Sequence, residues 1–263
     1  MVATKTGAAD SAWNGRLGAV SLTFDDGRAS QLNKVIPAMD ELGLRGTFYL
    51  NPRGKIVEEW RTRLEPWRAV QEAGHEVGNH SQNHVCSHAF KERPGGPGEP
   101  SLETWTLADV EADLLEAERR LTAVVPLQNG AQRTFCYPCY HEHVGEGATR
   151  QSYVPVVAKH FLAGRGIGER DNRAATCDLH YLWSWNVELM DGPELVGHAE
   201  RATQDYWVIM TFHDVGHDSR LSNTLDAFKE LCAFLARNQD RIWTAPVNEV
   251  AASVASWRGR ARA

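Results

Sequence analysis

Short apolar runs alternate with amphipathic segments along most of the chain. Residues 18–24 (GAVSLTF), 45–51 and 206–214 are rich in β-branched and aromatic residues, as buried strands are. Residues 30–43 and 106–125 instead repeat apolar positions at helical spacing. Strands that alternate with helices in this way predict an α/β fold with a parallel sheet, either open or closed into a barrel.

The rest of the chain continues the alternation. We predict further strands over 75–79, 133–138, 159–166, 179–187 and 241–245, and further helices over 58–74, over 224–238 and from Pro246 onward. Ser30 is the expected cap of helix 30–43 and Gly43 its stop, while Thr106 and Asp109 form a capping box. The segment 91–101, rich in proline and glycine, is expected to be an exposed loop.

Length and charge exclude several classes of protein. The 263 residues suffice for one large domain or two small ones, and we predict an extension over 1–17 and one domain over 18–258. A formal charge of −6, with no basic run and no apolar run long enough to span a bilayer, predicts no nucleic acid and no membrane partner. The N-terminus lacks the apolar core of a signal peptide, so the chain as it stands is expected to be cytoplasmic, or secreted if a signal was trimmed.

The five cysteines are scattered, and an odd number cannot all pair within the chain. Cys136 and Cys139 form a C-x-x-C, but no second cysteine pair lies nearby to complete a zinc site. We interpret them as two ordinary cysteines rather than as a redox or metal pair.

Polar clusters follow four of the predicted strands, over residues 25–27, 78–84, 137–142 and 212–218. In parallel α/β folds, functional sites form from the loops at the carboxyl ends of the strands. Four such ends that carry His or Asp are more than solvation requires, so we expect the site there.

Two histidines and two aspartates suggest a metal centre. His80 and His84 are four residues apart and share a face if they lie on a helical turn, although two exposed loop histidines are the simpler reading. One of Asp25 and Asp26 can complete a ligand set with open positions, which is typical of a catalytic zinc site. The other aspartate can act as general base toward the bound water.

His213 ends a different predicted strand and is a candidate general acid for the leaving group. Taken alone, a strand-end histidine bonded to Asp214 is the more ordinary interpretation.

These residues carry a resemblance to a known family. The segments TFDDG (23–27) and GHEVGNHSQNH (74–84) resemble the first two motifs of the polysaccharide deacetylases, the NodB-like group or family 4 carbohydrate esterases. TFCYPCY (134–140) and IMTFHD (209–214) are similar to the third and last motifs. The resemblance, which spans about residues 18–255, implies a distorted (β/α) barrel and metal-dependent removal of acetyl groups from a carbohydrate.

The resemblance also implies a role for each matching residue. Asp25 corresponds to the base, His213 to the acid, and the backbone N–H of Cys139 to the donor that holds the oxyanion. Asp26, His80 and His84 correspond to the ligands of one divalent metal ion, expected to be Zn²⁺, although Co²⁺, Ni²⁺ or Mn²⁺ would also be accepted.

Two positions depart from the family pattern. Cys136 stands where many members carry an arginine that pairs with the catalytic aspartate, and Arg133 and Arg165 are the nearby candidates to replace it. Tyr140 stands where the family has a glycine, so the loop is expected to take another shape.

Several further residues are candidates for substrate and support roles. Tyr137, Tyr140 and Trp185 are expected to stack on sugar rings, although core packing is the alternative for such aromatics, and one of Trp183 and Trp185 should point inward. Asp191 or Glu188 is expected to steady His213, and residues 141–147 offer further polar groups for substrate.

Three alternatives stay open at this point. The same ligand types describe a non-haem iron oxygenase, and the same fold hosts hydrolases of non-sugar amides. A catalytically silent carbohydrate-binding domain is the third. The expected partner is an acetylated oligo- or polysaccharide, and the sequence leaves O-acetyl and N-acetyl substrates equally open.

Overall fold

The computed structural model describes residues 11–90, 100–127 and 131–261, so nearly all of the predicted loop 91–101 lies outside the described part. The chain forms two compact units, each described by itself below. The first unit contains the residues up to Thr47, Gly168–Asp178 and the chain from Trp183 onward. The second unit contains Phe48–Ile167 and Leu179–Leu182.

The first unit is built on a parallel sheet. β1 (Gly18–Asp25) is central, with β12 (Ile242–Thr244) on one side and β9 (Trp207–Phe212) on the other. β8 (Trp185–Asn186) pairs with the outer side of β9. All eight residues of β1 are buried, which explains its nearly continuous apolar sequence.

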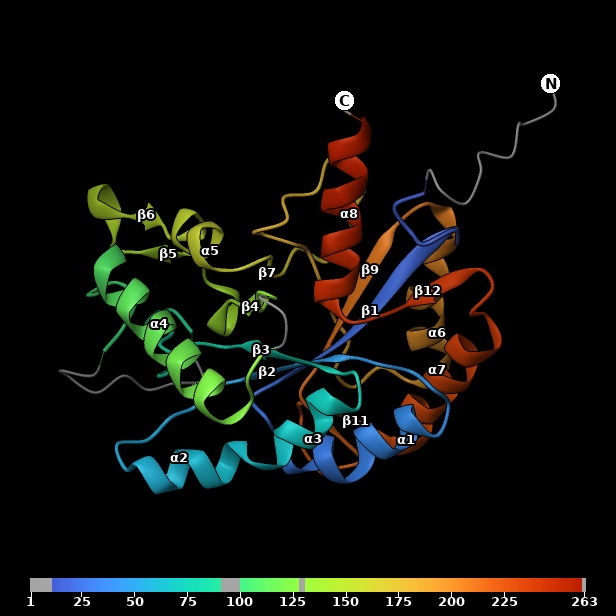
Figure 1. Ribbon diagram of the computed structural model, residues 1–263, viewed down its shortest axis with the longest axis horizontal. Helices are drawn as coiled ribbons and strands as arrows, with labels where there is room; N and C mark the ends of the chain where they lie inside the picture. Colours follow the sequence, from blue (N-terminus) through green and yellow to red (C-terminus); the bar gives the residue numbers. More distant parts are fainter. Residues whose placement is uncertain (1–10, 91–99, 128–130, 262–263) are drawn as a thin grey trace. The chain divides into compact units, whose positions relative to one another are not determined.

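Helices pack on this sheet, as Figure 1 shows for α8 beside β1. They are a π-helical turn (Gln31–Val35) that continues into α1 (Ile36–Asp40), α6 (Gly192–Glu200), α7 (Leu225–Arg237) and α8 (Val247–Ala261), with a 3₁₀ turn at Arg201–Gln204. Two short strands, β10 (Asp214–Val215) and β11 (Ser222–Asn223), pair after β9. Phe24, Phe212 and Phe228 pack together in the core, with ring centroids 5.3–5.9 Å apart.

The second unit carries its own strands in the order β7 (Gly164–Arg165), β4 (Phe135–Cys136), β3 (Glu76–Asn79) and β2 (Thr47–Leu50), of which Thr47 alone lies in the first unit. Its helices are α2 (Val57–Leu64), α3 (Pro66–Glu72), α4 (Leu107–Val124) and α5 (Val154–His160). A small antiparallel pair, β5 (His143–Val144) and β6 (Gln151–Ser152), and 3₁₀ turns at Pro138–Tyr140 and Gly147–Thr149 complete it.

Most of the predicted elements are present, and the α/β class is confirmed. Two helices were not predicted: α5 occupies the start of the predicted strand 159–166, and α6 follows β8. Ser30 does not cap its helix, since its hydroxyl donates to Asp214 instead. The Thr106–Asp109 capping box of α4 is confirmed.

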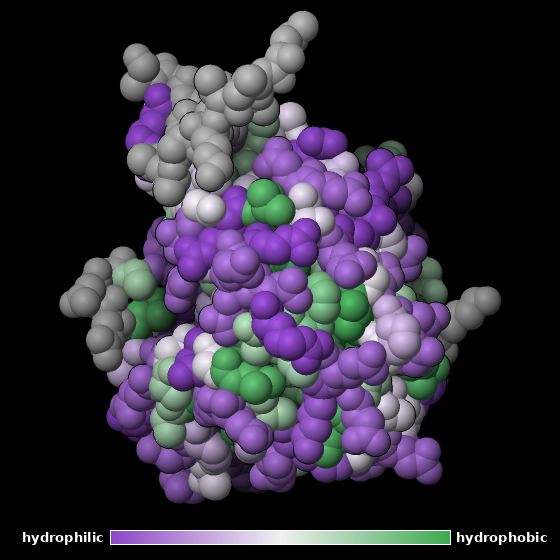
Figure 2. All heavy atoms as spheres, turned by 90° about the vertical axis from the view of Figure 1, so that its right-hand side faces the viewer, coloured by the Kyte–Doolittle hydropathy of each residue, from purple (hydrophilic) through white to green (hydrophobic). Residues whose placement is uncertain are grey.

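On the face drawn in Figure 2, hydrophobic residues are scattered among hydrophilic ones. No described helix combines the length and the apolar character needed to cross a membrane.

Candidate active site

In the first unit, β1 ends in two aspartates with different surroundings. Asp25 is the last strand residue and is 2% exposed, whereas Asp26 is partly exposed. Asp26 and Gly27 both have left-handed backbone, with φ of 72° and 62°. This sharp turn ends the strand and separates the directions of the two carboxylates.

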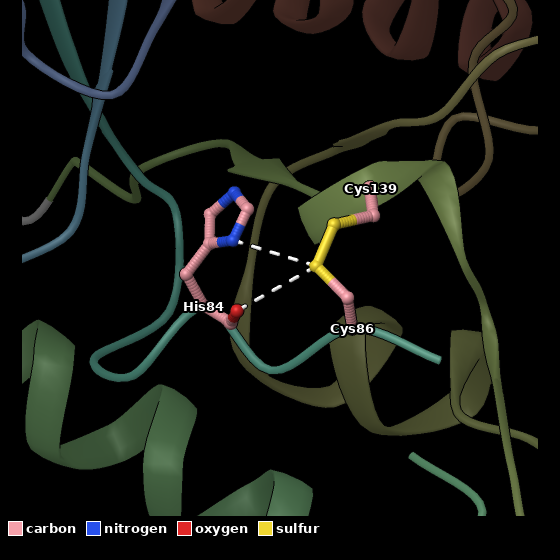
Figure 3. A group of neighbouring side chains, drawn as sticks. All are labelled: His84, Cys86 and Cys139. Atoms are coloured by element: carbon pink, nitrogen blue, oxygen red, sulfur yellow. Dashed lines mark hydrogen bonds between the residues drawn. A yellow bond between two sulfur atoms is a disulfide. The ribbon is translucent and has the colours of Figure 1, made fainter. Parts of the chain in front are cut away.

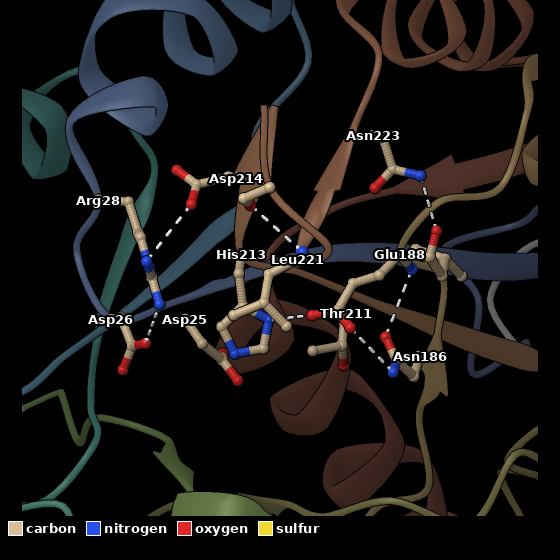
Figure 4. Close-up of polar contacts among 12 residues, drawn as sticks. Asp25, Asp26, Arg28, Asn186, Glu188, Thr211, His213, Asp214, Leu221 and Asn223 are labelled. Carbon is tan, nitrogen blue, oxygen red and sulfur yellow. Dashed lines mark hydrogen bonds and ion pairs between the residues drawn. The ribbon is translucent and has the colours of Figure 1, made fainter. Parts of the chain in front are cut away.

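Arg28 bridges two acidic side chains at this end of the sheet. Its guanidinium lies 3.0 Å from the Asp26 carboxylate and 3.4 Å from that of Asp214 (Figure 4). Asp214 also accepts a 2.7 Å hydrogen bond from the Ser30 hydroxyl. The sequence offered no reason to single out Arg28, whose partner Asp214 is 186 residues away.

Gln31 ties the ends of β1 and β9 together. Its side-chain amide donates to the Asp25 carbonyl at 2.6 Å and to the His213 carbonyl at 2.9 Å. Since Phe24 lies opposite Phe212 in the sheet, Asp25 and His213 leave their strands at neighbouring positions. The structure therefore brings together the predicted base and the predicted acid.

His213 forms an ion pair with Glu188, with 2.5 Å between Nδ1 and Oε1 (Figure 4). Asn186 donates to the other carboxylate oxygen of Glu188 at 3.1 Å, and its side-chain oxygen accepts from the Glu188 N–H at 3.3 Å. Of the two partners predicted for His213, Glu188 is the one found. Asp191 instead caps α6, where its side chain accepts from the Glu194 N–H.

The electrostatics of this cluster favour a protonated His213. Burial by itself would lower the pKa of His213, but the contact with Glu188 and the negative charges of Asp25 and Asp26 outweigh it. The pKa of His213 is therefore raised above its ordinary value. With Nδ1 held by Glu188, Nε2 is the nitrogen that can give a proton.

In the second unit, His80 and His84 lie close together, with ring centroids 4.6 Å apart at a steep angle. They follow β3 in an irregular loop and do not lie on a helical turn. Left-handed backbone at Ser81 (φ 60°) and His84 (φ 52°) folds the loop back on itself. The pair is thus real, but tight turns create it rather than helical periodicity.

Asp113 on α4 accepts hydrogen bonds from this loop. Its carboxylate accepts from the backbone N–H of Gln82 at 2.9 Å and from the side-chain amide of Asn83 at 2.6 Å. Burial raises the pKa of Asp113, and these hydrogen bonds work against that effect. An aspartate on the buried face of an amphipathic helix was the available signal, and our sequence analysis missed it.

The two histidines suit a metal ion. His80 Nδ1 lies 2.9 Å from the Cys136 carbonyl, so this nitrogen carries the proton and Nε2 carries the lone pair. Histidines that bind metals usually donate their second ring N–H to an acceptor of this kind. Asp26 as the third ligand stays a prediction, since it belongs to the other unit.

Cys86 and Cys139 form a disulfide that our sequence analysis did not predict (Figure 3). The interpretation of Cys139 as an ordinary cysteine was therefore wrong, because its partner is 53 residues away and not within the C-x-x-C. Cys136, by contrast, is buried and forms no disulfide, in agreement with its interpretation as an ordinary cysteine.

Cys139 and Tyr140 both adopt left-handed backbone, with φ of 53° and 60°. Tyr140 thus adopts, without being glycine, a backbone conformation that favours glycine. Among the described residues, the Cys139 N–H has no hydrogen-bond partner, which suits its predicted role as an oxyanion donor.

Arg165 lies beside the position where the family motif carries its arginine. It is fully buried on β7, directly opposite Cys136 in the sheet, and its guanidinium is 2.7 Å from the Cys136 sulfur. Arg133, the other candidate, instead binds the Glu118 carboxylate and the Val77 carbonyl.

The aromatic residues predicted to stack on sugar rings differ in how exposed they are. Tyr137 is fully buried and donates to the His180 carbonyl, so it is a core residue and not the sugar platform that was predicted. Trp185 is partly buried with its ring against His198, and Trp183 is 38% exposed. We expected one of the two to point into the core, and neither does. Tyr140 is partly exposed, with the Arg165 guanidinium 5.6 Å from its ring.

Comparison with known proteins agrees with the motifs. Residues 14–144 match the family model described as polysaccharide deacetylase. No curated protein shows a significant sequence match to the chain.

Solved structures extend the similarity to the rest of the chain. A putative polysaccharide deacetylase from Mycobacterium smegmatis shares 17% identity, covers 92% of each chain and gives a TM-score of 0.62. A family 4 carbohydrate esterase from Streptomyces lividans, solved in complex with acetate, shares 18% identity over 85% of this chain and 90% of its own, with a TM-score of 0.51. A CE4 family pseudoenzyme from Bacillus anthracis shares 14% identity over 89% of this chain and 65% of its own, with a TM-score of 0.54.

These structures share the NodB-like fold, so the predicted distorted (β/α) barrel class is confirmed. Taken together with the match over residues 14–144, they also confirm the resemblance to the polysaccharide deacetylase family that the motifs show.

Proposed function

We propose that this protein is a metal-dependent deacetylase that removes O- or N-linked acetyl groups from a carbohydrate. The observation that carries the proposal is that Asp25 and His213 lie at adjoining strand ends, with Glu188 beside the Nδ1 nitrogen of His213. Hydrolysis needs a base for water and an acid for the leaving group, and this arrangement offers both.

Asp26, His80 and His84 are the residues we propose as ligands of one divalent ion, with Zn²⁺ first and Co²⁺, Ni²⁺ or Mn²⁺ as alternatives. The proposal rests on the motif match and on the second nitrogen of His80, which is already engaged by the Cys136 carbonyl. Such an ion supplies Lewis-acid activation of water and of the acetyl carbonyl.

The residues of the chain then have distinct tasks. Asp25 takes a proton from the attacking water, and the Cys139 N–H donates to the oxygen on which negative charge develops. His213 gives a proton from Nε2 to the departing sugar oxygen or nitrogen, while Glu188 stabilises the charged imidazole. Tyr140 is the aromatic side chain that we propose against the sugar, since Tyr137 is buried.

A catalytically silent carbohydrate-binding domain is the second candidate, because some of the similar structures are described as a pseudoenzyme or its mutants. Binding alone needs neither a buried aspartate nor an ion-paired histidine next to it. The presence of both Asp25 and His213 therefore favours an enzyme.

Acetate release tests the proposal directly. The metal-loaded protein and a chelated control are each incubated with acetylated xylan oligomers, chitin oligomers and an acetylated monosaccharide. Metal-dependent acetate from any substrate supports a deacetylase, and the preferred substrate distinguishes O-acetyl from N-acetyl chemistry. Saturable binding of an oligomer with no acetate release would instead favour the silent binding domain.

The disulfide bears on where the protein works. Disulfides persist mainly in oxidising compartments. Because Cys86 and Cys139 form a disulfide, we propose that the protein works in such a compartment. This differs from the cytoplasmic location expected from the N-terminal sequence.

A further inference from the structure

Three side chains that can bind a metal meet beside the histidine pair. The ligand atoms of His84, Cys86 and Cys139 lie within 4.8 Å of one another. In the disulfide the two sulfurs carry no negative charge, and only a thiolate is a strong metal ligand. While the disulfide is intact, these three side chains therefore cannot act together as a metal site.

The disulfide also decides which nitrogen of His84 carries a proton. The Cys86 sulfur lies 3.6 Å from His84 Nδ1, and Figure 3 shows this edge of the ring turned toward the disulfide. A disulfide sulfur has no proton to donate, so at this contact it can only accept, and Nδ1 is the protonated nitrogen. The lone pair is then on Nε2, at the opposite edge of the ring.

We propose that reduction of the Cys86–Cys139 disulfide creates a second metal site, formed by both thiolates and His84 Nδ1. A Cys₂His set suits a thiophilic divalent ion such as Zn²⁺ or Co²⁺. Binding of the ion releases the two thiol protons, and the imidazole proton moves from Nδ1 to Nε2.

A dithiol can act as the reductant of this disulfide. A thiolate of the dithiol attacks the Cys139 sulfur, which is partly exposed, and Cys86, which is 6% exposed, leaves as a thiolate. The second sulfur of the dithiol then displaces Cys139. The dithiol becomes a disulfide, and its two protons and two electrons are now on the protein cysteines.

The two sites compete for one imidazole. A neutral imidazole has a single lone pair, so His84 cannot bind one ion through Nε2 and another through Nδ1. This consequence rests on the proposed function, in which His84 is a ligand of the catalytic ion. The oxidised protein would be the active form. When metal is limiting, reduction would move His84 from the catalytic ion to the new site and would lower activity.

Cobalt spectroscopy tests the new site without measuring activity. The protein is reduced under argon with a phosphine, which gives two electrons to the disulfide and takes the oxygen of water to become a phosphine oxide, while the two protons of water go to the cysteines. The phosphine is removed before Co²⁺ is added. We expect a thiolate-to-cobalt charge-transfer band in the reduced protein and none in the oxidised protein. Cys86→Ser with Cys139→Ser should lack the band, while Cys177→Ser, at a partly exposed free cysteine, should keep it.

Two results would overturn the proposal: no band in the reduced wild type, or an equal band in the double variant. His84→Gln keeps both cysteines and should weaken Co²⁺ binding to the reduced protein by about tenfold or more. Acetate release separates this idea from the proposed function. A band in the reduced protein, with no acetate from the metal-loaded oxidised protein, refutes the deacetylase alone.

Discussion

At the scale of single residues, strained backbone gathers where the proposed chemistry is. Among the described residues, nine non-glycine residues have positive φ, and five of them are Asp26, Ser81, His84, Cys139 and Tyr140. Such conformations cost about 1–3 kcal/mol each and persist where the surrounding structure enforces them. The disulfide at Cys139 and the Asp113 contacts to the His80–His84 loop are enforcing interactions of this kind.

Glu188→Gln is expected to lower the pKa of His213, since it removes the negative charge that raises this pKa. His213 would then lose its proton at lower pH, so the alkaline limb of kcat/KM should move to lower pH by about one unit or more. A pH profile of acetate release measures the shift. Asp191→Asn, which alters the cap of α6 instead, should leave the limb in place.

The same contact affects folding stability, with a defined sign. Because the pKa of His213 is raised in the folded state, its stabilising effect is complete below the ordinary histidine pKa. The effect is lost as the pH rises through the raised value.

The two aspartates should separate by function. Asp25→Asn is expected to keep the metal and to lose activity by about 10²–10⁴-fold, since a positioned base contributes about that much. Asp26→Ala is expected to lose the metal. Metal analysis of both purified variants measures this difference, and full metal occupancy in the Asp26 variant would contradict the assignment.

At the scale of elements, the loop after β3 depends on α4. Its tight turns place His80 and His84 together, but Asp113 on the helix supplies the acceptors for two consecutive backbone N–H groups, those of Gln82 and Asn83. The helix was predicted correctly from its apolar spacing and capping box. The contact between the helix and the loop was not predicted, because the hydrophobic periodicity of a helix says nothing about which loop packs against it.

Asp113→Ala is expected to destabilise the fold by about 1–3 kcal/mol, since it removes the acceptor of partly buried hydrogen bonds from Gln82 and Asn83. It should also weaken metal binding by about 10–100-fold, as loss of outer supporting contacts does. Chemical denaturation and metal titration measure the two effects.

Asp109→Ala on the same helix is the matched control. It removes the exposed capping box at a cost of about 1 kcal/mol and should leave metal affinity unchanged. An equal loss of metal affinity in both variants would show that helix stability, and not the Asp113 contacts, matters to the site.

At the scale of the whole molecule, the disulfide joins two loops of the second unit that are far apart in sequence. Cys86 follows the β3 loop and Cys139 follows β4, at a sequence separation of 53. A cross-link that closes a loop of this length restricts the unfolded chain. It therefore stabilises the fold as well as joining the histidine loop to the predicted oxyanion loop.

Replacing both cysteines, Cys86→Ser with Cys139→Ser, is expected to lower the free energy of unfolding by about 2–4 kcal/mol. Denaturant titration of the variant and of the oxidised wild type measures the difference. Reduced wild type should be destabilised by a similar amount in the absence of metal, and an unchanged midpoint in both would contradict a stabilising role.

Residue pattern and motif spacing were sufficient to predict the α/β class, most strands and helices, the family, and the pairing of Asp25 with His213. The α/β class and its elements follow from local periodicity, and the gathering of polar strand ends follows from the parallel sheet. The family came from the resemblance of the motifs. The Cys86–Cys139 disulfide, the Arg28 bridge, the choice of Glu188 over Asp191 and the burial of Tyr137 became visible only in three dimensions. Each depends on residues distant in sequence, or on loop turns and core packing that no repeating pattern encodes.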